Sequence, residues 1–158
     1  MVTIDQKRNS ISGCLTKASD AAPYVYNVLS AYVHLRLDYK DNPYKDSVKN
    51  KGEVYVIRCL VEDGTISNED YTKLSPNYPP PCTGTGYVAS PTYLIPEYCK
   101  IYDPNEPVHI EEGAIYCLDY DGKETLIAVF DPNQGALNKN GYPMGQFIDV
   151  SHFVSSNP

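Results

Sequence analysis

The side chains best suited to acid–base or metal chemistry in this chain are its three histidines, which lie far apart in the sequence. No nucleophile or metal-binding motif surrounds His34, His109 or His152, and no phosphate-binding loop or hydrolase signature is present. His109 stands near Glu111 and Glu112, which would complete a metal site, although such an acidic segment is more often a solvated loop. An enzyme would require His109 or His152 to meet carboxylates or a serine in the fold. We predict that the protein is not an enzyme.

The five cysteines are a second group with reactive side chains, at Cys14, Cys59, Cys82, Cys99 and Cys117. None belongs to a C-x-x-C pair, which argues against structural zinc. Disulfides are expected in an oxidising compartment, and the alternative is a set of buried free thiols. Cys82 and Cys99 would close the proline-rich segment between them. Cys59 and Cys117 lie in predicted strands and would face each other across a sheet, but the sequence leaves the pairing open.

An oxygen-rich segment, FDPNQGALNKNGYPMGQF at 130–147, is the candidate ion site. Asp131, Asn133 and Asn138 offer side-chain oxygens, and calcium takes about six to eight oxygen ligands in irregular loops. The competing interpretation is a metal-free loop that is held by Asx turns and by Pro143. One certain carboxylate neutralises a divalent cation poorly, so the metal-free interpretation is favoured and no cofactor is predicted.

The composition indicates one domain with its own core, because the chain has 158 residues and ordinary hydrophobic content. The net charge of −7 argues against a nucleic-acid partner, since binding one would need a basic face. No apolar run reaches the roughly 18 residues of a membrane span, and Met1 is not followed by the apolar part of a secretory signal. The 15 tyrosines and 13 prolines are typical of an extracellular protein with rigid loops.

The N-terminal region has the periodicity of one long helix over 4–40, because apolar residues recur at alternating steps of four and three. Pro23 interrupts this pattern, and we expect a kink there because proline removes a backbone donor. The alternative is two helices separated by a break at 19–23, with Ser19 or Asp20 as the new N-cap.

The rest of the chain predicts strands and loops. Asp-Gly between alternating apolar segments is a strong signal for a β-hairpin. A proline-rich surface segment at 75–108 precedes this hairpin. The predicted strands are 53–64, 114–120, 124–130 and 146–154, with the hairpin turn at 121–123. The predicted fold class is α+β, with a long N-terminal helix packed on a small antiparallel β-sheet.

This order of elements resembles the soluble part of type IV pilins and of type II secretion pseudopilins. The segment 113–145, GAIYCLDYDGKETLIAVFDPNQGALNKNGYPMG, is similar to the pilin-type ending of a hairpin, an Asp-x-Asn-Gly-like part and a Pro/Asn-Gly loop. The matching positions are Asp131, Asn133 and Gly135, with Gln134 inserted, and more loosely Asn138, Gly141, Pro143 and Gly145.

The resemblance implies a single pilin-like domain in three parts. These are a helical spine over 1–42, a variable connector with a disulfide-closed loop over 43–112, and a β-sheet region over 113–158. It also implies a calcium site in the loop after Asp131, because pseudopilin-like major subunits bind calcium in a similarly placed loop. The cleavage motif and the apolar N-terminal helix half of the family are absent. This leads to the hypothesis that Met1 is a truncated start and that the apolar half has been removed.

The implied function is that of a structural subunit of an extracytoplasmic pilus or pseudopilus filament, in adhesion, uptake, motility or secretion. The subunit would be anchored in a membrane before assembly and then lie in the periplasm or outside the cell. Its partners would be copies of itself, other pilin-like subunits and the inner-membrane assembly machinery. The alternative function is a secreted binding module or inhibitor that docks on its partner through the Pro/Tyr-rich loop 75–108.

Overall fold

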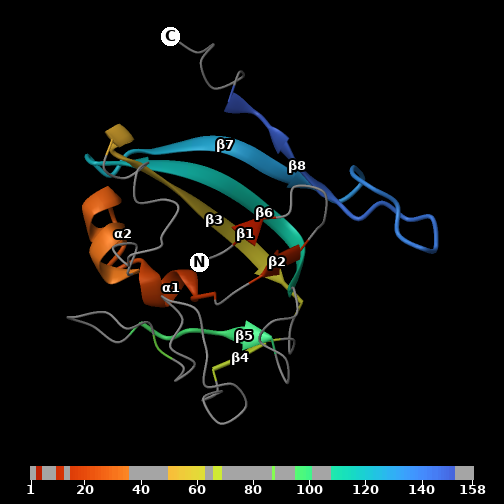
Figure 1. Cartoon of the computed structure of the whole chain (residues 1–158), viewed down its shortest axis with the longest axis horizontal. Coiled ribbons are helices and arrows are strands. Elements are labelled where there is room, and N and C mark those ends of the chain that lie inside the picture. The colour runs from red at the N-terminus through yellow and green to blue at the C-terminus, as the bar shows by residue number, and fades with distance from the viewer. Residues whose placement is uncertain are drawn as a thin grey trace.

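A computed structural model gives the fold and describes residues 3–4, 10–12, 15–35, 50–62, 66–68, 87, 95–100 and 108–151. The central feature is an antiparallel sheet with four main strands in the spatial order β3–β6–β7–β8 (Figure 1). The strands are β3 (Glu53–Val61), β6 (Val108–Asp119), β7 (Glu124–Asp131) and β8 (Gln146–Asp149). The four predicted strands are therefore present, and the last one is shorter than predicted.

The β6–β7 hairpin forms where the Asp-Gly pair predicted it. The Asp119 Oδ1 atom accepts hydrogen bonds from the backbone N–H of Asp121 at 3.0 Å and of Lys123 at 2.9 Å. Gly122 has a φ of 81°, and a Cβ atom there would lie 2.7 Å from the backbone oxygen of Tyr26. Glycine is thus needed for both the left-handed backbone and the close approach of the N-terminal region.

Four short strands complete the β-structure. Strand β1 (Thr3–Ile4) pairs with β2 (Ser10–Ser12), and β2 pairs with the start of β6. Strand β4 (Ile66–Ser67) pairs with β5 (Cys99–Lys100) in a separate two-stranded sheet. The first strands therefore extend the main sheet from the N-terminal part of the chain, where a helix was predicted.

The predicted helix over 4–40 is wrong, and so is the fold class of a long helix packed on a sheet. The described residues of this range hold two short helices, α1 (Ala18–Ala21) and α2 (Val28–His34). Pairing of β2 with β6 overrides the helical periodicity before residue 15, and Pro23 separates the two helices. The alternative of two helices had the right number of helices in the wrong place, because α1 occupies the predicted break.

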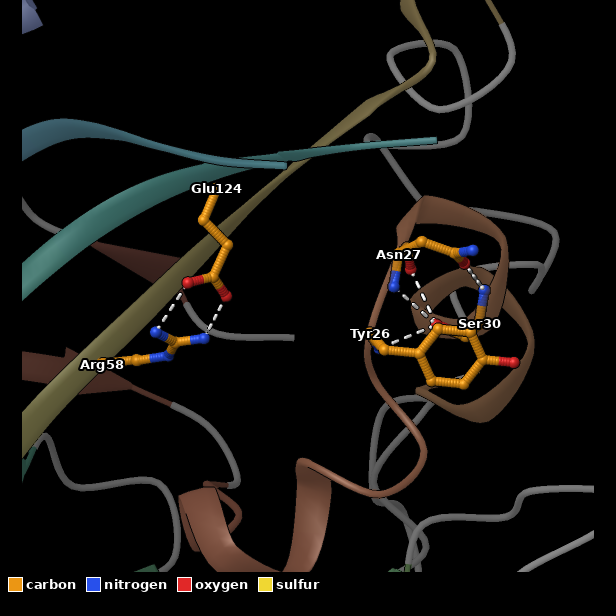
Figure 2. A network of polar contacts seen from close by, with 5 residues as sticks. All are labelled: Tyr26, Asn27, Ser30, Arg58 and Glu124. Atoms are coloured by element: carbon orange, nitrogen blue, oxygen red, sulfur yellow. Dashed lines mark hydrogen bonds and ion pairs between the residues drawn. The ribbon is translucent and has the colours of Figure 1, made fainter. Parts of the chain in front are cut away.

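Helix α2 begins at a reciprocal capping box (Figure 2). The backbone N–H of Ser30 donates to the Asn27 side chain at 2.9 Å, and the Ser30 Oγ atom accepts from the backbone N–H of Asn27 at 2.9 Å. The same Oγ atom accepts from the backbone N–H of Tyr26 at 2.9 Å. These bonds satisfy donors that a helix start otherwise leaves unpaired, so Asn27 rather than Ser19 or Asp20 caps the second helix.

Helix α2 packs on one end of one face of the sheet, which we call the helix face. Val28 and Ala31 of α2 form a buried cluster with Val54 of β3 and Leu118 of β6. Val54 and Leu118 are direct partners in the β3–β6 ladder, so their side chains share this face. Burial of large apolar side chains, worth about 1.5–3 kcal/mol each, holds the N-terminal region on the sheet.

A second buried cluster lies on the opposite face of the sheet and contains Ile110, Ile115, Ala128, Phe130 and Phe147. Ile57 packs against it and lies three residues after Val54, which places Ile57 on the other side of strand β3. Leu15, which precedes α1, also packs there. The sheet therefore has a core on each face. Among the described residues, the helices are too short or too polar to cross a membrane.

Candidate binding surface

The segment between β7 and β8, residues 132–145, forms a second, smaller hairpin that projects beyond the sheet (Figure 1). We call it the hairpin finger. Leu137 and Pro143 pair as an isolated antiparallel bridge, and the Met144 N–H donates to the Ala136 oxygen at 2.8 Å. The finger is therefore internally hydrogen-bonded, although its residues from 132 to 143 are exposed.

Asn138 organises the tip of the hairpin finger. Its backbone N–H donates to the Tyr142 oxygen at 2.8 Å, and its backbone oxygen accepts from Gly141 at 2.9 Å. Its Oδ1 atom accepts from the backbone N–H of Asn140 at 2.9 Å and of Tyr142 at 3.1 Å. Asn138 thus pairs the backbone groups of the turn through both its backbone and its side chain, which is the usual role of asparagine in an Asx turn.

Two glycines allow the base of the hairpin finger to pack closely against the core. Gly145 has a φ of 80°, and a Cβ atom there would lie 2.1 Å from the Phe130 ring. Phe130 packs on Phe147 with ring centroids 5.4 Å apart, and both rings belong to the buried cluster. A Cβ atom at Gly135 would lie 2.5 Å from the backbone oxygen of Gly145. The two arms of the finger therefore meet closely at its base, directly against the core.

The tip of the hairpin finger carries two large apolar side chains that the monomer leaves in solvent. Leu137 is 64% exposed and Tyr142 is 68% exposed. Leu137 pairs with Pro143, and Tyr142 is the residue before Pro143, so the Leu137 and Tyr142 side chains project from opposite faces of the finger. A single exposed apolar residue is ordinary, whereas two large ones at the tip of a projecting hairpin are typical of a contact site.

The predicted calcium ligands lie in this finger or at its base, where they form turns. The Asp131 Oδ1 atom accepts from the Asn133 N–H at 2.9 Å, and Asn138 holds the tip as described. Asp131, Asn133 and Asn138 are thus tied to two separate turns. Within the described part of the chain, groups of three or more His, Cys, Asp or Glu side chains suited to hold a metal are absent.

An open recess of about 520 Å³ lies on the helix face, away from the residues that α2 covers. Leu60 on its floor is 54% exposed, and Val129 is 40% exposed. Leu60 is the partner of Glu112, and Val129 is the partner of Ala114, so these side chains share the helix face. The side chains that line the recess on this face are those of Arg58, Leu60, Glu112, Ala114, Tyr116 and Val129.

Arg58, which lines the open recess, forms an ion pair with Glu124 (Figure 2). Arg58 donates from Nη1 to Glu124 Oε2 at 2.9 Å and from Nη2 to Glu124 Oε1, in a bidentate arrangement. The guanidinium of Arg58 also lies over the Tyr116 ring, 5.0 Å from its centroid. The side chains of Arg58 and Glu124 are 50% and 36% exposed, so the solvent screens the pair and it contributes little stability, but it neutralises this end of the recess.

Two of the cysteines have described side chains, and both are free thiols. Cys59 lies opposite Gly113 and Cys117 opposite Tyr55 in the β3–β6 ladder, so they share a face but not a pair of positions. The predicted Cys59–Cys117 disulfide is therefore not formed in this structure. The side chains of Cys14, Cys82 and Cys99 lie outside the described residues, and so does the other predicted link, Cys82–Cys99.

The Cys117 thiol is held protonated by its surroundings. Burial, a hydrogen bond to Glu53 Oε2 at 3.4 Å, and the nearby charges of Glu53 and Asp119 together raise the pKa of Cys117 to about 11. Burial alone raises the pKa of Cys59. Burial and the Glu53 carboxylate also raise the pKa of Tyr55. A nucleophilic cysteine needs the opposite shift, so neither thiol is activated.

The histidines fall on separate elements. His34 ends α2 and lies 6.0 Å from the Tyr24 ring, measured between centroids. His109 is exposed near the start of β6, where its backbone pairs with β2. His152 lies outside the described residues.

Sequence reasoning missed the apolar side chains of the surface. Leu60 belongs to a strand that the sequence predicted. The alternation of side chains along a strand would have shown on which face of the sheet Leu60 lies. Leu137 and Tyr142 flank the Asn-rich turn, and their apolar character within a polar loop was the available signal. Sequence pattern alone does not show which apolar residues a neighbouring element leaves uncovered.

Comparisons with family models, curated proteins and solved structures found no match to this chain. None of them identifies a pilin or a pseudopilin.

Proposed function

We propose that this protein is a non-catalytic binding module that recognises a protein partner through the hairpin finger. The observation that carries this proposal is the joint exposure of Leu137 and Tyr142 on a hairpin that its own hydrogen bonds hold in shape. Binding through an ordered loop loses little conformational entropy, so a preformed apolar tip supports affinity.

The finger has the architecture of a recognition element. Its base is fixed in the core through Gly145 and Phe130, and its tip is set by Asn138. Tyrosine at a binding surface supplies a large contact area with few rotatable bonds and a hydroxyl that can meet a polar rim. These features support protein binding over catalysis as the use of this surface.

The expected filament role depended on a continuous N-terminal helix. The structure has β-strands and two short helices in that region, so the main physical support for this role is lost. The alternative of a binding module does not need that helix. Its expected contact loop, 75–108, lies mostly outside the described residues, and the hairpin finger replaces it in the proposal.

Site-specific photocrosslinking tests the proposal. A photoreactive phenylalanine analogue replaces Tyr142 in the full chain, which is then produced in cells that normally make the protein. We expect one discrete protein adduct on irradiation, and a lower yield when Asn138→Ala loosens the tip.

A matched control is available on the same molecule. Tyr26 is 62% exposed, comparable to Tyr142, but it lies next to helix α2 and far along the chain from the finger. The same analogue at Tyr26 should give no discrete adduct. Equal adducts from both positions, or none from Tyr142, would refute recognition through the finger.

A further inference from the structure

We infer that the partner of the hairpin finger is a second copy of this chain, and that the tip of the finger docks in the open recess of that copy. This inference rests on the proposed function and names its partner. It joins two surfaces that the monomer leaves exposed, the finger tip at one end of β7 and the recess on the helix face of the sheet.

The two surfaces match in apolar character. The tip presents Leu137 and Tyr142, and the recess presents Leu60 and Val129, all of them more than a third exposed in one copy. Contact between the copies would remove these side chains from water together, which favours association. The Tyr116 ring, which also lines the recess, is a suitable neighbour for a second tyrosine.

The charges of the two surfaces are complementary. Lys139 is the only charged residue between positions 132 and 145, and it lies in the turn at the finger tip. Arg58 is neutralised by Glu124, which leaves Glu112 as the charge of the recess. Neither Lys139 nor Glu112 forms an ion pair within the part of the chain that the structure describes. The finger therefore brings a cation to a surface that holds an unpaired carboxylate.

The assembled contact resembles a small protein interface in its design. An apolar centre made by Leu60 and Leu137 is flanked by one pair of opposite charges at its rim, which sets the orientation of the two copies. A finger–recess contact joins unlike surfaces, so each copy can both donate a finger and receive one.

Analytical ultracentrifugation of the full chain over a dilution series tests the inference. We expect reversible self-association, weakened at least about tenfold by Leu60→Lys in the recess and by Leu137→Lys at the tip. The control is Val33→Lys, which makes the same kind of change at an exposed position on α2 and should leave the dissociation constant unchanged. A chain that remains monomeric up to about 1 mM would overturn the inference.

Charge reversal makes the test specific for the proposed orientation. Lys139→Glu and Glu112→Lys should each weaken self-association, and the double variant should recover most of the lost affinity because the charge pair is restored in reverse. Additive losses in the double variant would refute the docking of the tip in the recess. Circular dichroism of each variant confirms that the fold is retained.

The two proposals fail in different ways. A discrete heterologous adduct from Tyr142 on a monomeric chain would leave the finger as a binding element and overturn the second copy as its partner. A monomeric chain without any adduct from Tyr142 would overturn both. An adduct between two copies that maps to Leu60 or Glu112 would support both.

Discussion

Replacing Gly145 by alanine tests how the hairpin finger is joined to the core. Gly145 has a φ of 80°, and its missing Cβ would lie 2.1 Å from Cζ of Phe130. A left-handed backbone costs a non-glycine residue about 1–2 kcal/mol. Displacing the packed Phe130 ring adds an overpacking cost of about 1–3 kcal/mol. The expected loss of unfolding free energy for Gly145→Ala is therefore about 2–5 kcal/mol.

Gly141→Ala is the matched control, because it separates backbone strain from the clash. Gly141 has nearly the same φ, 82°, but no heavy atom lies within 4 Å of its Cβ position. Gly141→Ala should therefore lose at most the backbone cost of about 1–2 kcal/mol of unfolding free energy. The difference between the two variants, about 1–3 kcal/mol, then reports the contact with Phe130.

Urea unfolding followed by circular dichroism measures both losses, provided that the slope of the transition is the same in both variants. For a chain of this size, each kcal/mol lowers the melting temperature by about 2–4 °C. Equal losses for Gly145→Ala and Gly141→Ala would refute the packing of the finger base on Phe130.

Three further predictions concern the cap of α2, the finger tip and the thiol on β6. Asn27→Ala should cost about 0.5–2 kcal/mol in urea unfolding while Asn27→Ser costs much less, because serine is also a good N-cap; equal losses would contradict the capping role. Asn138→Ala removes the side-chain oxygen that accepts hydrogen bonds from two amides of the finger tip, so trypsin should cut after Lys139 faster than in the wild type. Asn133→Ala is the control and should be cut at the wild-type rate, because Asn133 contributes only its backbone N–H to a turn. An unchanged rate in Asn138→Ala would contradict this role of Asn138. Glu53→Gln should lower the pKa of Cys117 from about 11 toward its ordinary value of 9.0 and speed alkylation of Cys117 near pH 9, with Cys59 as the internal reference in peptide mapping; an unchanged Cys117 rate would count against the thiol–carboxylate contact.

The same thiol gives stability a defined dependence on pH. The folded chain retains the Cys117 proton up to a pKa of about 11, whereas the unfolded chain releases it near 9. Its contribution to stability is therefore complete below pH 9 and is lost as the pH rises from 9 to 11. The raised pKa values of Cys59 and Tyr55 act in the same direction. Glu53→Gln should reduce the loss of unfolding free energy between pH 9 and 11, as measured by urea unfolding. A larger loss in this variant would contradict the assignment.

The β-sheet was predictable because its signals are local. The Asp-Gly pair sets the β6–β7 turn through Gly122 and Asp119, and alternating β-branched residues mark β3. The N-terminal strands were not predictable in this way. Spacing of three and four is compatible with a helix, but pairing of the segment around Ile11 with β6 is a long-range contact that no local period reports.

The candidate surface was only partly predictable, for a related physical reason. The polar segment after β7 was recognised, and its asparagines were correctly considered as Asx-turn residues, with Asn138 as the best example. The exposed apolar side chains within it, on which the proposed function rests, were not identified. Apolar residues are expected inside, so the exposure of Leu137, Tyr142 and Leu60 becomes apparent only when the fold shows what fails to cover them.

Amide hydrogen exchange of the dilute full chain tests the central claim most directly, namely that the hairpin finger holds its shape in the free protein. The amides of Asn138, Tyr142 and Met144 donate hydrogen bonds within the finger. We predict that they exchange at least about tenfold more slowly than in an unstructured peptide, which corresponds to about 1.4 kcal/mol of local opening free energy. Exchange of all three amides at the rate of an unstructured peptide would contradict a preformed finger and the binding role that depends on it.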